Sequence, residues 1–326
     1  DWLFDGFLFL EFKDGSGRNY TVGYEKLNAR RTEWEWLLDR IFEQGKSLSA
    51  LDRCIGQEIK ELGKPAFRHQ IVLGLPEAIR GQKDWGEIDG REMDFSKEED
   101  QIAATKRYIG ELVERFKAAK FKHLELSGFY WVAEDTHHCA ELTIPLSEYI
   151  HSEGKLFYWI PYWQAKGHEE WKRLGFDVAY QQPNHFFNHS IPDSRLDEAC
   201  ATARRHGMAM EFEFDEKATA AIPNSSHDRM AAYINHFEKN DVFNSSAVAY
   251  YCGNRGVLTL DESDNPKDKA LMDRLARIIQ ARRYLKYGIP MKNKTRVVAH
   301  RGFWHTDGSA QNSIASLLKA DQLGVY

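Results

Sequence analysis

The sequence predicts an α/β fold, a (β/α)8 TIM-like barrel, from three observations. Seven short apolar, aromatic-rich runs alternate with helical patterns, as parallel βα units do. Several runs are apolar on both faces, as expected when helices cover one side and a barrel interior fills the other. No Gly-x-Gly-x-x-Gly or Gly-Lys-Ser/Thr loop follows a run, so the rival, an open doubly wound nucleotide-binding sheet, loses support.

The expected strands occur in order along the chain. They cover residues 7–12, 69–76, 123–131, 156–163, 176–184, 208–215 and 246–253. Seven runs leave the barrel one strand short, so its first strand lies upstream or in residues that the pattern does not identify. With that strand counted, the 123–131 strand becomes the fourth and the 208–215 strand the seventh.

Helices and loops are expected between the strands. Residues 13–65 hold two helices, 77–95 form a Gly/Asp/Glu-rich loop, and 97–119 carry an apolar stripe typical of a helix. Ser96 and Glu99 have the spacing of a capping box for that helix. Four glycines precede strands and are expected to end helices in the left-handed conformation: Gly63, Gly154, Gly175 and Gly207.

The pattern changes near residue 266 and indicates two domains. Residues 1–290 read as the barrel, ending in an amphipathic helix at 270–284, and residues 291–326 read as a linker and the start of a second barrel. The first residues run directly into a strand with no leader, and the last ones stop where a strand is expected. We therefore interpret the sequence as part of a longer protein.

Composition excludes several classes of protein. The 326 residues are 42% hydrophobic and 29% charged, which excludes disorder, and the net charge of −5 gives no footprint for nucleic acid or an anionic membrane. No apolar run approaches the roughly 18 residues that a membrane span needs. The four cysteines form no Cys-x-x-Cys pair, so they predict neither a zinc knuckle nor a dense disulfide framework.

Carboxylates at strand ends are the main candidates for catalysis. Glu134 follows one strand, and on a later strand Glu211, Glu213 and Asp215 alternate with phenylalanines, so period two sends the acids to one face. Two opposed carboxyl groups about 5 Å apart can perform double-displacement glycoside hydrolysis. We expect Glu134 to be the acid/base and Glu213, or Glu211 one repeat earlier, to be the nucleophile. The alternative is that these acids, with Glu11 and Glu125, are buried structural carboxylates held by hydrogen bonds and arginines.

Aromatic and amide side chains near the same strand ends could bind a sugar. Aromatic planes stack on sugar rings, and amides bond the hydroxyls. We expect Trp131 and Trp163 to be exposed there, whereas about half of the strand aromatics should be core. The remaining expected contacts with substrate are Glu11, Gln181, Gln182, Asn184, His185, Asp215 and Tyr251.

No metal, cofactor or nucleophilic serine or cysteine is expected in the barrel. The run from Glu134 to His138 holds adjacent histidines that point apart, and Thr136 is more simply read as a helix N-cap. No Gly-x-Ser-x-Gly turn and no cysteine in a basic pocket is present.

Four motifs carry a resemblance over residues 1 to about 290: FDGFLF from Phe4, GFYWVAE ending at Glu134, YQQPN from Tyr180, and MEFEFD from Met210. The sequence resembles a family of exported bacterial proteins known mainly as a domain of unknown function. Its members are similar to glycoside-hydrolase-like barrels and are common in polysaccharide-degrading gut bacteria. The resemblance implies a carbohydrate substrate and an extracytoplasmic location, periplasmic or on the cell surface. In the glycosidase clan with acids on strands four and seven an Asn usually precedes the acid/base, and Ala133 stands there in this sequence.

The last thirty residues resemble the start of glycerophosphodiester phosphodiesterases, which open with a strand ending in His-Arg-Gly. The resemblance implies that His300 is the first catalytic histidine, that Arg301 binds phosphate, and that Asn312 belongs to the Glu-Asn motif, in which Gln311 replaces the metal-binding acid. The second metal pair and histidine would lie beyond Tyr326, so this fragment should not cleave phosphodiesters.

Three functions follow from these features. The leading hypothesis is a glycoside hydrolase acting on a complex polysaccharide. The second is a non-catalytic glycan-binding or scaffold module that delivers a C-terminal phosphodiesterase domain to its substrate. The third is that phosphodiester hydrolysis is the main activity of the parent protein.

Overall fold

A computed structural model describes residues 2–137 and 139–287, with side chains through Arg282. Its core is a curled sheet of seven parallel strands in the order β1-β4-β7-β8-β9-β10-β11. The strands are β1 (Gly6–Phe9), β4 (His69–Leu75), β7 (Leu124–Trp131), β8 (Leu156–Trp159), β9 (Val178–Gln181), β10 (Ala209–Glu213) and β11 (Val248–Tyr251). The seven expected strands and the α/β class are thus confirmed, with the observed strands shorter than the apolar runs.

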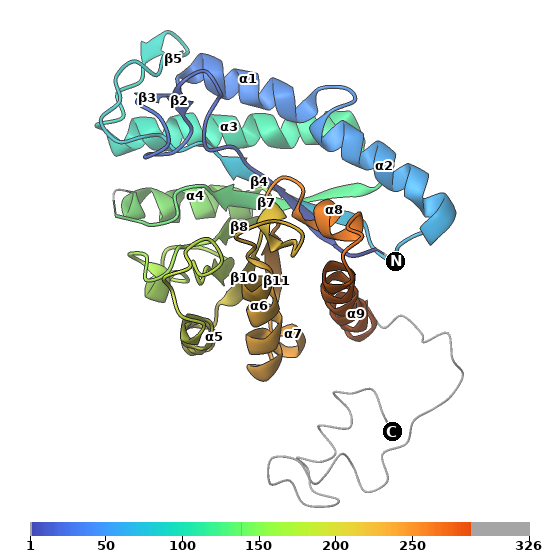
Figure 1. The fold of residues 1–326 in the computed structure, drawn as a ribbon. Helices are drawn as coiled ribbons and strands as arrows, with labels where there is room; N and C mark the ends of the chain where they lie inside the picture. The colour runs from blue at the N-terminus through green and yellow to red at the C-terminus, as the bar shows by residue number, and fades with distance from the viewer. Residues whose placement is uncertain (1, 138, 288–326) are drawn as a thin grey trace, which may run out of the picture.

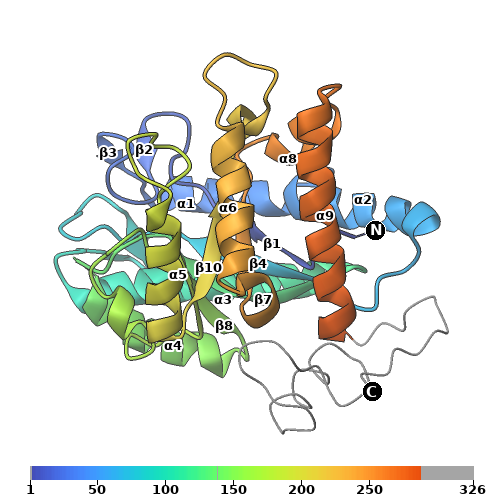
Figure 2. The ribbon, with the colours of Figure 1, turned by 60° about the horizontal axis from the view of Figure 1, so that its bottom comes forward.

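Helices follow the strands and cover the outer face of the sheet (Figure 1). Helices α5, α6 and α9 stand next to one another along that face (Figure 2). The helices are α1 (Arg31–Phe42), α2 (Ser47–Leu62), α3 (Glu98–Ala119), α4 (Ala140–Ser152), α5 (Ser194–His206), α6 (His227–Lys239), α7 (Val242–Ser245), α8 (Gly256–Asp261) and α9 (Pro266–Tyr287), with 3-10 turns η1 (His168–Glu170) and η2 (Glu216–Ala218). Short pairs β2 (Arg18–Asn19) with β3 (Leu27–Asn28), and β5 (Glu87–Ile88) with β6 (Arg91–Glu92), lie in the two expected excursions.

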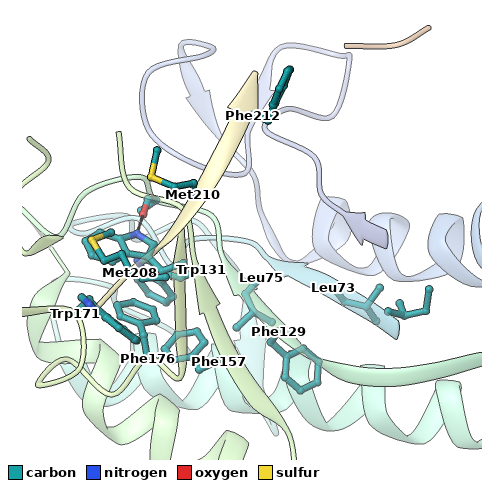
Figure 3. Close-up of a cluster of buried hydrophobic side chains, with 14 of the residues drawn as sticks. Leu73, Leu75, Phe129, Trp131, Phe157, Trp171, Phe176, Met208, Met210 and Phe212 are labelled. Carbon is teal, nitrogen blue, oxygen red and sulfur yellow. Dashed lines mark hydrogen bonds between the residues drawn. The ribbon is translucent and has the colours of Figure 1, made fainter. Parts of the chain in front are cut away.

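The two faces of the sheet carry different side chains. On the outer face, Trp131 packs edge-on against Phe157, whose ring lies 4.5 Å from that of Phe176, as part of the main core (Figure 3). The concave face holds a separate cluster built almost wholly from strand residues and the residues that follow them. Its buried members are Tyr130, Val132 and Ile160, with Leu8, Leu10, Phe12, Val72, Tyr158 and Tyr180 packed against them. The sheet therefore encloses a filled interior, as a barrel does.

The expected barrel, with its first strand upstream or not identified, is not closed among the described residues. No pairing joins the edge strands β1 and β11 among them. The two edges instead approach through side chains, because the rings of Phe4 and Tyr250 lie 5.6 Å apart. In the observed sheet the 123–131 strand is third and the acid-bearing β10 is sixth; the expected fourth and seventh positions count one further strand before β1 and stay a prediction.

Two expected helix starts are wrong. Helix α3 begins after Lys97, and the side chain of Asp94, not a capping box from Ser96, bonds the local backbone. Helix α4 begins at Ala140, so Thr136 is not its N-cap; its hydroxyl donates to the carbonyl of Lys166 over 2.9 Å. In both places a short polar side chain satisfies a loop instead of the helix end.

Gly128 leaves the least room for a Cβ atom among the described glycines. Strand β7 has an irregularity beside it, since Leu126 pairs with Ile71 and Gly128 with Val72, which leaves Ser127 unpaired. A Cβ atom on Gly128 would lie 2.0 Å from the carbonyl oxygen of Leu156 on β8. Only glycine fits at this point.

The four glycines expected to end helices all have positive φ, but Gly175 follows a turn and ends no α-helix. Gly63, Gly154, Gly175 and Gly207 all have positive φ values, and Gly63 and Gly207 directly cap α2 and α5. The phosphodiesterase-like residues His300, Arg301 and Asn312 lie outside the described residues. Within residues 2–137 and 139–287, no helix combines the length and the apolar composition that crossing a bilayer would require.

Candidate active site

Strand β10 places Glu211 and Glu213 on the concave face of the sheet. Ala209 pairs with Tyr180, a residue of the concave cluster, so Glu211 and Glu213 share that face by the two-residue period. The intervening Phe212 packs on the opposite side against Tyr233 of α6. The expected alternation of acids and aromatics is confirmed.

Glu213 sits at the end of β10 in a set of neutral hydrogen-bond donors. The Tyr233 hydroxyl and the backbone N–H of His185, at 3.2 Å, both donate to its Oε2, and the Asn184 N–H also bonds the carboxylate. Asn184 has φ +48°, a left-handed conformation that turns these successive N–H groups toward one point. The sequence folds this way because an Asn tolerates that conformation better than most residues do.

Glu134 follows β7, and the segment after β9 reaches both Glu134 and Glu213. The Gln182 amide bonds the Glu134 carboxyl, and the Asn184 amide donates to the Gln182 side-chain oxygen over 2.8 Å. The Asn184 side-chain oxygen in turn accepts a hydrogen bond from the backbone N–H of Trp163 at 2.6 Å. The segment after β9 therefore touches both candidate carboxyl groups and fixes their relative placement.

Glu134, Glu211 and Glu213 lie within electrostatic reach of one another. Burial raises the pKa of all three, and the charge of Glu134 raises the pKa of Glu211 and Glu213 further. The pKa of Glu213 rises to about 7 in spite of its hydrogen bonds, and that of Glu211 rises well above its usual value. The group thus holds protons at pH values where exposed glutamates are ionised, which is typical of functional sites.

Exposed aromatic rings lie near the three acids. Tyr24 and Tyr251 are 46% and 48% exposed; partial burial raises the pKa of both hydroxyls, and the charge of Glu134 adds to the rise. Tyr24 stacks on Phe12 with ring centres 4.5 Å apart, and Phe187 meets Tyr251 edge-on at 5.8 Å. We call Tyr24, Tyr162, Phe187 and Tyr251 the aromatic rim.

Some residues expected to bind substrate lie elsewhere. Trp131 is 1% exposed in the outer-face core, so the expected exposure is wrong, because its strand turns Tyr130 and not Trp131 to the concave side. Gln181 is 0% exposed and pairs in register with Met210 on the outer face. Glu11 is exposed, and partial burial raises its pKa against the opposing charge of Arg40; none of the three acids is among the groups that shift it.

Other expected residues do lie close to the acids. Gln182 and Asn184 contact them directly, and Tyr251 pairs in register with Glu213. Asp215 lies beyond Glu213, where its carboxylate accepts the Lys217 N–H and caps η2.

Two further expected residues support the site from outside it. Trp163 is partly exposed and stacks with the Arg195 guanidinium, 4.7 Å from the ring centre. The His185 side chain is fully buried, bonds Asp193 over 2.8 Å and has its pKa lowered to about 4 by burial, so it stays neutral.

Sequence reasoning missed Tyr233, Tyr24 and Phe187. Tyr233 lies in an apolar stripe of α6 that reads as core, and its ring is indeed core; only its hydroxyl reaches Glu213. Tyr24 and Phe187 lie in loops, where no periodic pattern gives a direction. Arg229 was also missed; it bonds the carbonyls of His185, Phe186, Asn188 and Ile191 and so holds the loop after β9.

No group of three or more His, Cys, Asp or Glu side chains is arranged to hold a metal ion in the described part of the chain. The chemistry available from these residues is proton transfer and carboxylate attack.

Comparison with known proteins places the chain in a family. Residues 1–277 match the family described as Domain of unknown function (DUF4855). The chain belongs to this family. No curated protein matches the DUF4855 chain. Among solved structures, one from Bacteroides thetaiotaomicron, provisionally described as an alpha-L-fucosidase, is similar with 13% identity and a TM-score of 0.42, over 81% of each chain. At that level the likeness carries no argument about activity.

Proposed function

We propose that this DUF4855 chain is a glycoside hydrolase that acts on a complex polysaccharide, with Glu134 as acid/base and Glu213 as nucleophile. The observation that carries the proposal is that two strands far apart in sequence bring carboxyl groups together on one concave face, in different environments. The extracytoplasmic location implied by the sequence resemblance belongs to the same proposal.

The roles follow from exposure and hydrogen bonding. Three donors hold Glu213 in one orientation and offset part of the rise in pKa that burial causes. With a pKa of about 7, part of the Glu213 population is ionised near neutral pH, as attack on the anomeric carbon requires. Glu134 is the most exposed of the three acids, which suits a group that must exchange its proton with water in each turnover. Glu211 lies two residues before Glu213, farther from the end of β10, and is the alternative nucleophile.

The proposed reaction has two displacements. A Glu213 oxygen bonds the anomeric carbon as the glycosidic C–O bond breaks, and the leaving oxygen takes the proton of Glu134. Water then attacks the anomeric carbon, gives a proton to Glu134, and releases the Glu213 carboxylate. The aromatic rim would stack on sugar rings flanking the cleaved bond.

The test uses aryl glycosides of the common sugars and a polysaccharide panel. Glu134→Gln and Glu213→Gln should each lower turnover by about two orders of magnitude or more on any substrate that the wild type cleaves. Glu125→Gln is the matched control, because Glu125 lies exposed near the opposite end of the β7 strand that Glu134 follows. Wild-type protein that cleaves no glycoside, or acid variants that remain fully active, would contradict the proposal.

A glycan-binding module is the second candidate, favoured by one observation. Glu211 and Glu213 are only 7% and 3% exposed, whereas rings of the aromatic rim are about half exposed. A sugar could therefore stack on the rim without reaching Glu213. Binding of an oligosaccharide that is recovered uncleaved, and that depends on Tyr24 and Tyr251 but not on Glu213, would favour this function.

A further inference from the structure

The candidate site is unusual in its charge, and this bears on the substrate. Among the described residues, no Lys or Arg makes an ion pair with Glu134, Glu211 or Glu213. The donors that reach the acids, such as the Gln182 amide and the Tyr233 hydroxyl, are neutral. Buried carboxyl groups without a cationic partner are costly once ionised.

The charged groups around the acids mostly have the same sign. Asp135 adds to the field at Glu134, and Asp215 and Glu216 lie near Tyr251. The Arg229 guanidinium interacts electrostatically with Glu213, but its N–H groups are bonded to carbonyl oxygens of the loop that follows β9.

The remaining titratable neighbours bring no positive charge. The Tyr24, Tyr130 and Tyr251 hydroxyls have raised pKa values and stay neutral, and burial keeps the His185 ring neutral as well. The Cys252 thiol, near Glu211 and Glu216, has its pKa raised to about 11.

Glu211 supplies the second observation. Its side chain is 7% exposed on the concave face, and no described residue donates a hydrogen bond to its carboxyl group. The Glu211 oxygens are not among the described side-chain atoms that are shut off from solvent without a partner, so they stay open to solvent or to a ligand. The exposed rings of Tyr24 and Tyr251 nearby add faces that attract organic cations.

We infer that the sugar bound at this site carries a protonated amine, as glucosamine and galactosamine residues do, and that the three carboxyl groups receive it. This inference rests on the proposed function for the identity of the site and adds the class of substrate. An ammonium group supplies both the missing positive charge and donors for Glu211. Uronic or sulfated sugars bring negative charge that opposes ionisation of the same acids, so they gain no attraction from them. An N-acetylated sugar carries no positive charge, so it cannot supply the cation that the three carboxyl groups lack.

Proton release gives a direct signature of such binding. Because the acids hold protons when the site is empty, an entering ammonium group favours their ionised forms and protons leave to solvent. A neutral sugar bound at the same place gives no such release. The number of protons released is obtained by calorimetry in two buffers with different ionisation enthalpies.

The experiment titrates the full chain at pH 7 with methyl glycosides of glucosamine and galactosamine, their N-acetyl forms, and the corresponding uronic acids. We expect one amino sugar to bind about tenfold or more tightly than its N-acetyl form, a difference of about 1.4 kcal/mol, with proton release. Glu211→Gln should reduce this preference, and Glu125→Gln should leave it unchanged. The wild-type proton count keeps the test valid even if Glu211→Gln does not fold.

The outcomes separate the inference from the proposed hydrolase. Equal affinity for amino and N-acetyl sugars, tighter binding of uronic acids, amine binding without proton release, or no binding of any amino sugar would overturn the inference. Cleavage of neutral glycosides without amine preference would overturn it while the hydrolase stands. Amine-selective binding without cleavage would support the inference and contradict the hydrolase.

Discussion

Replacing Glu213 with Gln should change how stability depends on pH. The folded protein raises the Glu213 pKa from 4.5 to about 7, chiefly through burial. At about 1.4 kcal/mol per pKa unit, this difference corresponds to about 3 kcal/mol. The raised pKa means that the neutral form is preferred in the folded state. Stability from this group is therefore fully present below pH 4.5 and is lost as the pH rises through 7.

The Gln side chain is neutral at every pH and keeps an oxygen to accept the Tyr233 hydroxyl. Relative to wild type, Glu213→Gln should thus gain up to about 3 kcal/mol of unfolding free energy between pH 4.5 and 8. Urea unfolding followed by far-UV circular dichroism at several pH values in this range measures the gain.

Glu125→Gln is the control, because Glu125 is exposed and should give the same small difference from wild type at each pH. A difference between Glu213→Gln and wild type that is constant across this pH range would refute the reasoning. It would mean that the Glu213 carboxyl group is not held neutral by burial, and the electrostatic account of the site would fail with it.

Three further predictions concern the site and the core. Tyr233→Phe removes a donor to the ionised Glu213 carboxylate, so the Glu213 pKa should rise by about one unit or more. Carbon NMR of labelled glutamate side chains, assigned with Glu213→Gln, measures this pKa. An unchanged or lower pKa would exclude the hydrogen bond from Tyr233 to Glu213. Gly128→Ala should prevent β7 from pairing with β8, since its Cβ would lie 2.0 Å from the Leu156 carbonyl; a melting temperature equal to that of wild type would show that the strands are spaced differently. Trp131→Ala should cost about 3 to 5 kcal/mol of unfolding free energy. The affinity of the folded protein for a sugar should stay unchanged, because the Trp131 ring is 1% exposed on the outer face. Weakened sugar binding with normal stability would contradict that placement.

The fold class could be predicted because the strands and helices alternate so regularly. Each strand of the sheet lies in a short apolar run, and the left-handed glycines mark two helix ends directly. Helix starts were harder. Asp94 bonds the backbone N–H of Ser96 in its own loop, and Thr136 bonds the carbonyl of Lys166, which only the tertiary structure brings near it. Barrel closure could not be read from the runs, since it depends on how β1 and β11 approach each other.

The site was predictable where period two applies and not elsewhere. Glu211 and Glu213 share a face because they alternate along β10, and the sequence shows that directly. The same rule does not say which face is concave, so Trp131 was assigned to the wrong side. Tyr233 and Arg229 act from α6 through one hydroxyl and one guanidinium, and nothing in a helical stripe marks such tips.

The seam between the edge strands has a consequence for local opening. Strands β1 and β11 each pair on one side only in the described structure, and rings of Phe4 and Tyr250 bridge the remaining space. The Tyr250 hydroxyl is buried there without a hydrogen-bond partner among the described residues. Contacts between rings break more readily than a row of backbone hydrogen bonds does. Backbone amides of β1 and β11 should therefore exchange with deuterium sooner than those of the central β7 and β8. The sheet would then loosen first along this line, and the acids of β10 lie one strand away from it.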